Sequence, residues 1–172
     1  MFINMQAEIN SSIENDPAPK SKMQVKLLCP SVKALKRHKI AKWFHRRNFS
    51  FIASCISQRT RNKTGIEIHP GATIGKGLFI DHGIGVVIGE TAEIGENCLI
   101  FHGSTLGGIG GESGKRHPTL GNNVVVGAGA KLLGNITIGD NAKIGANAVV
   151  LQDVPAGATA VGVPARIIEK GE

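Results

Sequence analysis

Residues 126–150 read VGAGAKLLGNITIGDNAKIGANAVV, and a branched aliphatic residue returns at every sixth position of this stretch. The same spacing runs through the earlier part of the chain. The repeat heads are Ile68, Ile74, Ile80, Ile88, Ile94, Ile100 and Leu106, then Val126, Leu132, Ile138, Ile144 and Val150. A short fixed period with one apolar residue per repeat is typical of a parallel β-helix. The sequence therefore predicts a mainly β protein whose core is a stack of these aliphatic residues.

Small residues follow the repeat heads at a fixed distance. Four positions after successive heads stand Ala72, Leu78, Ala92, Cys98, Ser104, Ala130, Ile136, Ala142 and Ala148. This arrangement favours a triangular coil in which each hexad forms one flat side and a small residue fits each crowded corner. Three hexads then make one turn of about 18 residues.

The six-residue spacing is interrupted twice. Two extra residues separate Ile80 from Ile88, and 20 positions separate Leu106 from Val126. The second interruption holds the polar, glycine-rich sequence GGIGGESGKRHP at residues 107–118, which cannot form a side of the coil. Solenoid proteins carry insertions as loops on one face, often the binding face. We expect a protruding, mobile loop over residues 107–118.

The N-terminal third has a different composition. Residues 1–64 contain no glycine and carry 13 Lys and Arg against 3 Asp and Glu, whereas all 23 glycines follow. Apolar spacing predicts short helices at 6–13 and 23–28, a helix from Pro30 to about Phe44, and another helix that ends near Gly65. The predicted organisation is a basic α-helical cap (1–64), a parallel β-helix (65–168) and a short C-terminal tail (169–172).

Composition also limits the class of protein. The basic segment lacks interleaved aromatic platforms or a recognition-helix signature, so we expect no nucleic-acid partner. No apolar run approaches the ~20 residues that span a bilayer, so we expect no membrane insertion. Cys29, Cys55 and Cys98 are odd in number and widely spaced, which favours reduced thiols and a cytoplasmic location.

Histidines near the interruptions are the candidates for chemistry. His82 and His102 each follow a repeat head by two positions and should stack on one side of the coil. His82 follows Asp81 directly and is the better candidate for a base. A zinc site completed by His117 or His69 is a further interpretation, and so is a histidine that only packs. Cys98 occupies a small corner position, which favours packing over a nucleophilic role.

Longer stretches go beyond a generic repeat. GIEIHPGATIGKGLFIDHGIGVVIGETAEIG (65–95), STLGGIGGESGKRHP (104–118) and VGVPARII (161–168) resemble the serine acetyltransferases, a family of hexapeptide-repeat acyltransferases. The resemblance implies a left-handed β-helix. It also implies transfer of acetyl from acetyl-CoA to the hydroxyl of L-serine, the first step of cysteine biosynthesis.

The resemblance assigns roles residue by residue. The catalytic base falls on His82 and its carboxylate partner on Glu67, where many relatives have Asp. The acceptor-binding positions are Asp16, Asp81, Arg116 and His117. The positions that bind acetyl-CoA are Gly108, Ala128 and Ala146. Ala128 and Ala146 lie 18 residues apart and should stack on one face.

Free serine explains the choice of acceptor-binding residues. Asp16 and Asp81 offer anions for its ammonium, and Arg116 offers a two-pronged donor for its carboxylate. A neutral His82 can take the hydroxyl proton. Because the thioester is already activated, direct transfer needs no covalent intermediate, permanently bound cofactor or metal.

The resemblance also implies partners. These are a homotrimer with sites between subunits, with a dimer of trimers left open, and L-cysteine as a feedback inhibitor. The tail at 169–172 is short and lacks a terminal isoleucine, so a complex with cysteine synthase is not expected. Two other functions stay open: O-acetylation of a sugar or another hydroxyl acceptor, and a non-catalytic trimeric scaffold.

Overall fold

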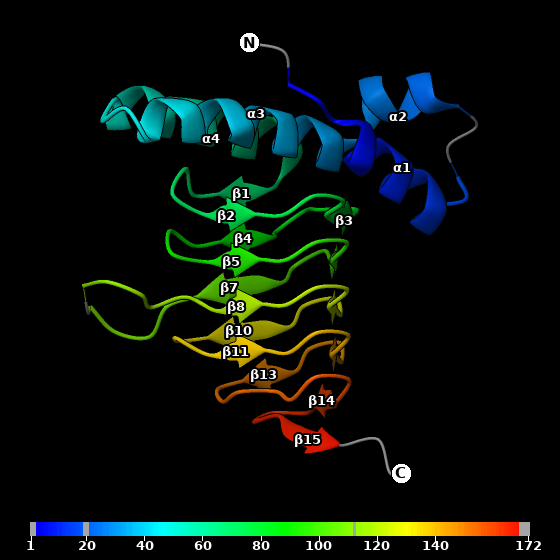
Figure 1. The fold of residues 1–172 in the computed structure, drawn as a ribbon, viewed down its shortest axis with the longest axis vertical. Coiled ribbons are helices and arrows are strands. Elements are labelled where there is room, and N and C mark those ends of the chain that lie inside the picture. The colour runs from blue at the N-terminus through cyan, green and yellow to red at the C-terminus, as the bar shows by residue number, and fades with distance from the viewer. Residues whose placement is uncertain (1–2, 19–20, 112, 169–172) are drawn as a thin grey trace.

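The protein was analysed as a computed structural model that describes residues 3–18, 21–111 and 113–168. Four helices lie across one end of a long coil of short strands, as Figure 1 shows. The helices are α1 (Gln6–Asn15), α2 (Lys22–Leu28), α3 (Pro30–His45) and α4 (Ser50–Thr64). All four predicted helices are present, and α4 ends at Thr64, directly before Gly65, as predicted.

Local sequence accounts for the helix ends. Ser21 accepts a hydrogen bond from the backbone N–H of Gln24 and so caps the start of α2. Pro30 opens α3, where its missing N–H costs no hydrogen bond. Gly65 ends α4 with φ +72°, a left-handed conformation that suits glycine. The chain turns from the helical cap into the coil at this residue.

The coil consists of three sheets whose strands are parallel, apart from the last strand. The strands are β1 (Glu67–Ile68), β2 (Thr73–Ile74), β3 (Phe79–Asp81), β4 (Val87–Ile88), β5 (Glu93–Ile94), β6 (Leu99–Phe101), β7 (Thr105–Gly107), β8 (Thr119–Leu120), β9 (Val125–Val126), β10 (Lys131–Leu133), β11 (Thr137–Ile138), β12 (Lys143–Ile144), β13 (Val149–Val150), β14 (Thr159–Val161) and β15 (Arg166–Ile168). Sheet A has the order β1-β4-β7-β10-β13, sheet B β11-β8-β5-β2, and sheet C β15-β14-β12-β9-β6-β3. Among the described strands, only β15 pairs antiparallel, with β14. The fold is the left-handed parallel β-helix of about five turns found in hexapeptide-repeat acyltransferases.

The predicted core is confirmed. Repeat heads pair in register along each sheet, for example Ile68 with Ile88 and Leu132 with Val150. The small residues expected at the corners are all buried, at 7% exposure or less. Three further residues occupy head positions: Leu120 pairs with Ile94 and Ile138 in sheet B, Val154 lies opposite Ile138, and Ala160 pairs with Ile144. The chain therefore re-enters the coil directly after the loop, which protrudes between β7 and β8 in Figure 1.

The helical cap seals the open end of the coil. A first coil has no preceding coil to pair with, so its edge leaves backbone groups without partners. At this edge, a side chain of the cap forms a hydrogen bond with a backbone group of each sheet. Ser57 donates to the Ile68 carbonyl at 2.6 Å, Lys42 donates to the Ala72 carbonyl at 2.9 Å, and Ser31 accepts from the Ile80 N–H at 3.0 Å. Cap and coil also share one hydrophobic core, so the two parts pack as a unit.

A buried histidine lies within this cap. His38 is 6% exposed, and within the described residues neither of its ring nitrogens has a hydrogen-bond partner. Burial and, to a smaller extent, the nearby charges of Lys42, His69 and Lys39 together lower the pKa of His38 from 6.5 to about 4. Folding therefore holds this ring neutral under conditions in which the unfolded chain binds a proton.

Acid should weaken the fold through His38. Because the pKa is lower in the folded state, the unfolded chain binds more protons between pH 6.5 and 4, and the free energy of unfolding falls as the pH drops through this window. The loss should reach about 3 kcal/mol per chain. Urea unfolding at fixed protein concentration and pH 7, 6, 5 and 4 measures it. His38→Leu should flatten the dependence, whereas His45→Gln on the same helix should keep it. Equal slopes in wild type and His38→Leu would contradict the assignment.

Two expectations from the sequence concern the C-terminal tail and membrane insertion. The tail at 169–172, on which the expectation about cysteine synthase depends, lies outside the described residues. Among the residues that are described, no helix is long and apolar enough to cross a bilayer.

Candidate active site at two corners of the coil

His82 sits in the turn between β3 and β4, where the chain passes from sheet C to sheet A. Its φ is +56°, a conformation that other turns of the coil give to asparagine or glycine. A histidine in this region costs conformational energy, which points to a functional constraint at the position. Its side chain is 75% exposed, so the imidazole is available to a ligand.

The neighbours of His82 include one carboxylate and one ring. Its Nε2 lies 3.9 Å from Oδ2 of Asp81. The ring of His102 in the next coil lies 5.7 Å away between centroids, in an edge-to-face arrangement. The predicted stacking of His82 and His102 on one side of the coil is confirmed.

A cavity of about 520 Å³ opens beside this turn. Asp81 and His82 line it from the coil, and Asp16 lines it from the segment between α1 and α2. Oδ1 of Asp16 accepts a hydrogen bond from the Ala18 N–H at 2.9 Å, which fixes the carboxylate at the end of α1. The helical cap thus places the Asp16 carboxylate in the same cavity as Asp81 and His82 of the coil.

The same corner continues down the coil as a ladder of backbone groups. The Gly129 N–H donates to the His102 carbonyl, and the Asn147 N–H donates to the Ala128 carbonyl. Ala128 and Ala146 therefore stack as predicted. Among the residues that the structure describes, the N–H groups of Ala128 and Ala146 have no hydrogen-bond partner, so both can donate to a bound molecule. We call the turns that hold His82, His102, Ala128 and Ala146 the His82 corner.

Arg116 lies at a different corner, between sheets A and B, beside the protruding loop. Its guanidinium forms an ion pair with Glu90 at 2.6 Å. Gly108 packs against Arg116: a Cβ on Gly108 would lie 3.2 Å from the Arg116 carbonyl oxygen. We call the turns that hold Glu90, Thr91, Arg116 and His117 the Arg116 corner.

His117 is held on this corner in a defined protonation state. Its Nδ1 accepts the Thr91 backbone N–H at 3.2 Å and lies 2.9 Å from the Thr91 hydroxyl. Because a backbone N–H can only donate, Nδ1 carries no proton and Nε2 carries it. Burial lowers the pKa of His117, and the Arg116 charge lowers it further. His117 is thus a neutral ring that offers Nε2–H as a donor.

Glu67 lies on β1 at the edge of sheet A. Its Oε2 forms an ion pair with Arg61 of α4 at 3.1 Å. Within the described part of the chain, no hydrogen bond joins Glu67 to His82. One chain by itself therefore does not assemble the pair of base and carboxylate that the resemblance implies.

The candidate residues thus fall into two groups. Asp16, Asp81 and His82 share one cavity, whereas Arg116 and His117 lie one coil side away, roughly 20 Å at the rise of an extended strand. In Figure 1 the loop protrudes from the edge of the coil opposite β3 and α1. Sequence reasoning missed Glu90 and Thr91, which hold Arg116 and His117; the only sequence signal was their position in the turn after a repeat head.

The described residues contain no cluster of three or more His, Cys, Asp or Glu side chains that could hold a metal ion. The burial of Cys98 raises the pKa of its thiol, which agrees with a packing role. The His82 corner therefore offers an exposed imidazole beside two carboxylates. The Arg116 corner offers a cation beside a neutral ring that can donate a hydrogen bond.

Comparison with known proteins identifies the family. Residues 117–152 match the family model for bacterial transferase hexapeptide (six repeats). The serine acetyltransferase of Helicobacter pylori strain J99 is 57% identical over 169 residues, which are 98% of this chain and 99% of that protein. The chain belongs to the serine acetyltransferase family.

Solved serine acetyltransferases share the whole architecture. The Neisseria gonorrhoeae enzyme in complex with serine matches with a TM-score of 0.92 and 41% identity, over 96% of this chain and 67% of that one. A serine acetyltransferase in complex with cysteine matches with a TM-score of 0.92 and 42% identity, over 95% of this chain and 68% of that one. This family member thus spans about two thirds of the solved chains.

Proposed function

We propose that this protein is a cytoplasmic serine O-acetyltransferase. It transfers acetyl from acetyl-CoA to the hydroxyl of L-serine, and the products are O-acetyl-L-serine for cysteine biosynthesis and free CoA. The observation that carries the proposal is the cavity that places an exposed imidazole, His82, beside the carboxylates of Asp16 and Asp81. An amino acid that brings both an ammonium and a hydroxyl suits this set of groups.

His82 acts as the general base in this mechanism. The serine ammonium pairs with Asp16 and Asp81, and the hydroxyl donates its hydrogen bond to the His82 ring. As the serine oxygen attacks the thioester carbonyl carbon, His82 takes the hydroxyl proton. The tetrahedral intermediate collapses, the carbon–sulfur bond breaks, and the CoA thiolate takes the proton back from the imidazolium. Atoms and protons balance, and no covalent enzyme intermediate forms.

A neighbouring chain supplies the rest of the site. Arg116 and His117 lie on another corner of their own chain, so they reach a His82 cavity only when a second coil packs alongside. A homotrimer of triangular coils provides such contacts, because cyclic symmetry sets one corner of each chain against a different corner of the next. Arg116 then binds the serine carboxylate, His117 donates Nε2–H to that carboxylate or to the developing oxyanion, and Glu67 of the neighbour orients His82. The proposal leaves open whether two trimers pair through the helical caps.

Acetyl-CoA binds along the His82 corner. The N–H groups of Ala128 and Ala146 are available, and their 18-residue separation places them in successive coils. They can hold the amide oxygens of an extended pantetheine arm, whose thioester then points toward His82. Gly108 of the neighbouring chain, which packs against Arg116, lies near the thioester end in this proposal. Acetyl-CoA enters as a co-substrate, and no permanently bound cofactor is part of the proposal.

L-Cysteine is the proposed feedback inhibitor. It carries the same ammonium and carboxylate as L-serine and should compete for Asp16, Asp81 and Arg116. The solved family members in complex with serine and with cysteine support this choice of ligands.

Release of the CoA thiol tests the proposal. Wild-type protein is incubated with acetyl-CoA and, in separate assays, L-serine, L-homoserine or a panel of sugars. We expect turnover with L-serine that L-cysteine inhibits in competition with L-serine. Faster turnover with a sugar would identify the protein as a different O-acetyltransferase, and no thiol release with any acceptor would identify a scaffold.

A further inference from the structure

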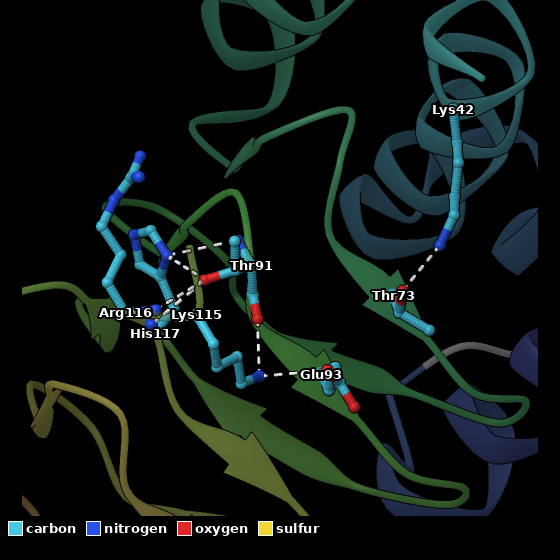
Figure 2. A network of polar contacts seen from close by, with 7 residues as sticks. All are labelled: Lys42, Thr73, Thr91, Glu93, Lys115, Arg116 and His117. Atoms are coloured by element: carbon cyan, nitrogen blue, oxygen red, sulfur yellow. Dashed lines mark hydrogen bonds and ion pairs between the residues drawn. The ribbon is translucent and has the colours of Figure 1, made fainter. Parts of the chain in front are cut away.

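The Thr91 hydroxyl lies at the centre of the contacts that hold the protruding loop on the coil. Thr91 directly follows Glu90 in the turn between β4 and β5. Its Oγ1 accepts the backbone N–H groups of Arg116 at 3.1 Å and His117 at 3.2 Å. The same oxygen lies 2.9 Å from Nδ1 of His117. Figure 2 shows these contacts converging on Thr91.

The Thr91 backbone adds contacts on both sides of the hydroxyl. Its N–H donates to Nδ1 of His117, and its carbonyl accepts from Nζ of Lys115 at 2.6 Å. Lys115 also pairs with Glu93 at 3.2 Å. Three consecutive loop residues are therefore tied to one residue of the coil.

We propose that Thr91 is a positioning residue for the acceptor: its hydroxyl fixes the backbone of Arg116 and His117 and, through Nδ1, the orientation of the His117 ring. Both loop amides would lose this acceptor if the hydroxyl were lost, and the loss of an acceptor for a polar group costs more than the bond itself contributes. The C-terminal end of the loop would then separate from the coil, together with the side chains of Arg116 and His117. This inference deepens the proposed function, because it names what holds half of the serine site.

The surroundings of the His117 ring support this role. The Cδ2–Nε2 edge of the ring lies directly over Gly89: a Cβ on that glycine would come within 2.1 Å of Cδ2 and 2.2 Å of Nε2. The ring thus rests between Thr91 and a residue without a side chain, and it is buried at 8% exposure. Contacts with Thr91 on one side and Gly89 on the other hold the His117 ring in a single orientation.

Two threonine variants separate the hydroxyl from the shape of the side chain. Thr91→Val keeps the volume and removes the hydroxyl, and Thr91→Ser keeps the hydroxyl. Thr73→Val is the matched control, because the Thr73 hydroxyl accepts a hydrogen bond from Lys42 at 3.0 Å but contacts neither Arg116 nor His117. Two quantities are measured on the full-length protein: hydrogen exchange of the Arg116 and His117 amides, and the steady-state constants for serine and acetyl-CoA.

Thr91→Val should speed exchange of both amides at least about tenfold and raise the KM for serine roughly tenfold. The KM for acetyl-CoA should change much less than the KM for serine. Thr91→Ser should restore both quantities toward wild type, and Thr73→Val should leave both unchanged. A Thr91→Val protein with wild-type exchange and wild-type KM for serine would overturn the inference.

Gly89→Ala provides an independent variant. The added methyl displaces the His117 ring but leaves the Thr91 hydroxyl in place, so the KM for serine should rise while exchange of the two amides stays slow. The exchange measurements do not depend on the proposed activity. If wild type fails to acetylate serine, the proposed function is wrong, and exchange still decides whether Thr91 holds the loop. Fast exchange in Thr91→Val with an unchanged KM for serine would show a purely structural contact and would overturn the positioning role.

Discussion

Replacement of His82 by Ala should lower kcat for acetyl transfer to serine by about 10²–10⁴-fold, the usual contribution of a positioned general base. The variant loses the proton acceptor for the serine hydroxyl but keeps the Asp16 and Asp81 carboxylates and the Ala128–Ala146 ladder. Binding of acetyl-CoA should therefore change little. Release of CoA thiol at saturating substrates measures kcat, and calorimetric titration measures affinity for CoA.

His102 provides the comparison for this result. Its ring lies 5.7 Å from the His82 ring and is also exposed at the same corner. His102 has no carboxylate partner among the described contacts, so His102→Ala should lower kcat by less than about tenfold. If His102→Ala abolished transfer while His82→Ala retained most of it, the roles of the two rings would have to be exchanged.

The second large effect is recovery of activity when two inactive variants are mixed. His82→Ala and Arg116→Ala should each lose most of their activity with serine, the first in kcat and the second through the KM for serine. In mixed trimers, some sites combine an intact His82 from one chain with an intact Arg116 from its neighbour. In a trimer that contains both variants, one of the three sites is intact, so about a third of wild-type activity should return.

The experiment uses co-expression of the two variants with different purification tags, so that only mixed trimers are assayed. The control mixes the two purified homotrimers without allowing chains to exchange, and it should stay inactive. The double variant His82→Ala/Arg116→Ala should also be inactive alone. Mixed trimers without recovered activity would show that both residues must act from the same chain and would contradict a site built between subunits.

The coil was predictable because its stability depends on near neighbours. Each hexad contacts the hexads one turn before and one turn after, so a residue such as Ile144 needs only the six-residue spacing to be assigned to the core. The helices followed from equally local signals, including Pro30 at the start of α3 and Gly65 at the end of α4. Leu120 also fits the six-residue spacing, since it lies six positions before Val126, and only the count from Leu106 is broken by the loop.

The sealing contacts of the cap were not predictable. Ser31 and Ile80 are 49 residues apart, and nothing in the sequence around Ser31 distinguishes it from an ordinary helix residue. Thr91 is a similar case, since in the sequence it is one of several threonines near a repeat head. Such polar contacts depend on two surfaces that meet only after the chain has folded.

The sequence by itself determined the architecture and the residue types available for chemistry, because a repeated spacing and short local motifs do not need distant contacts to be recognised. Only the tertiary structure decided where those residues lie. It brings Asp16 of the cap to Asp81 and His82. It places Arg116 and His117 on another corner, where their backbone N–H groups bind the Thr91 hydroxyl. The reason is geometric: in a triangular coil the corner that a residue occupies, and the surface that it meets, follow from packing in three dimensions and not from spacing along the chain.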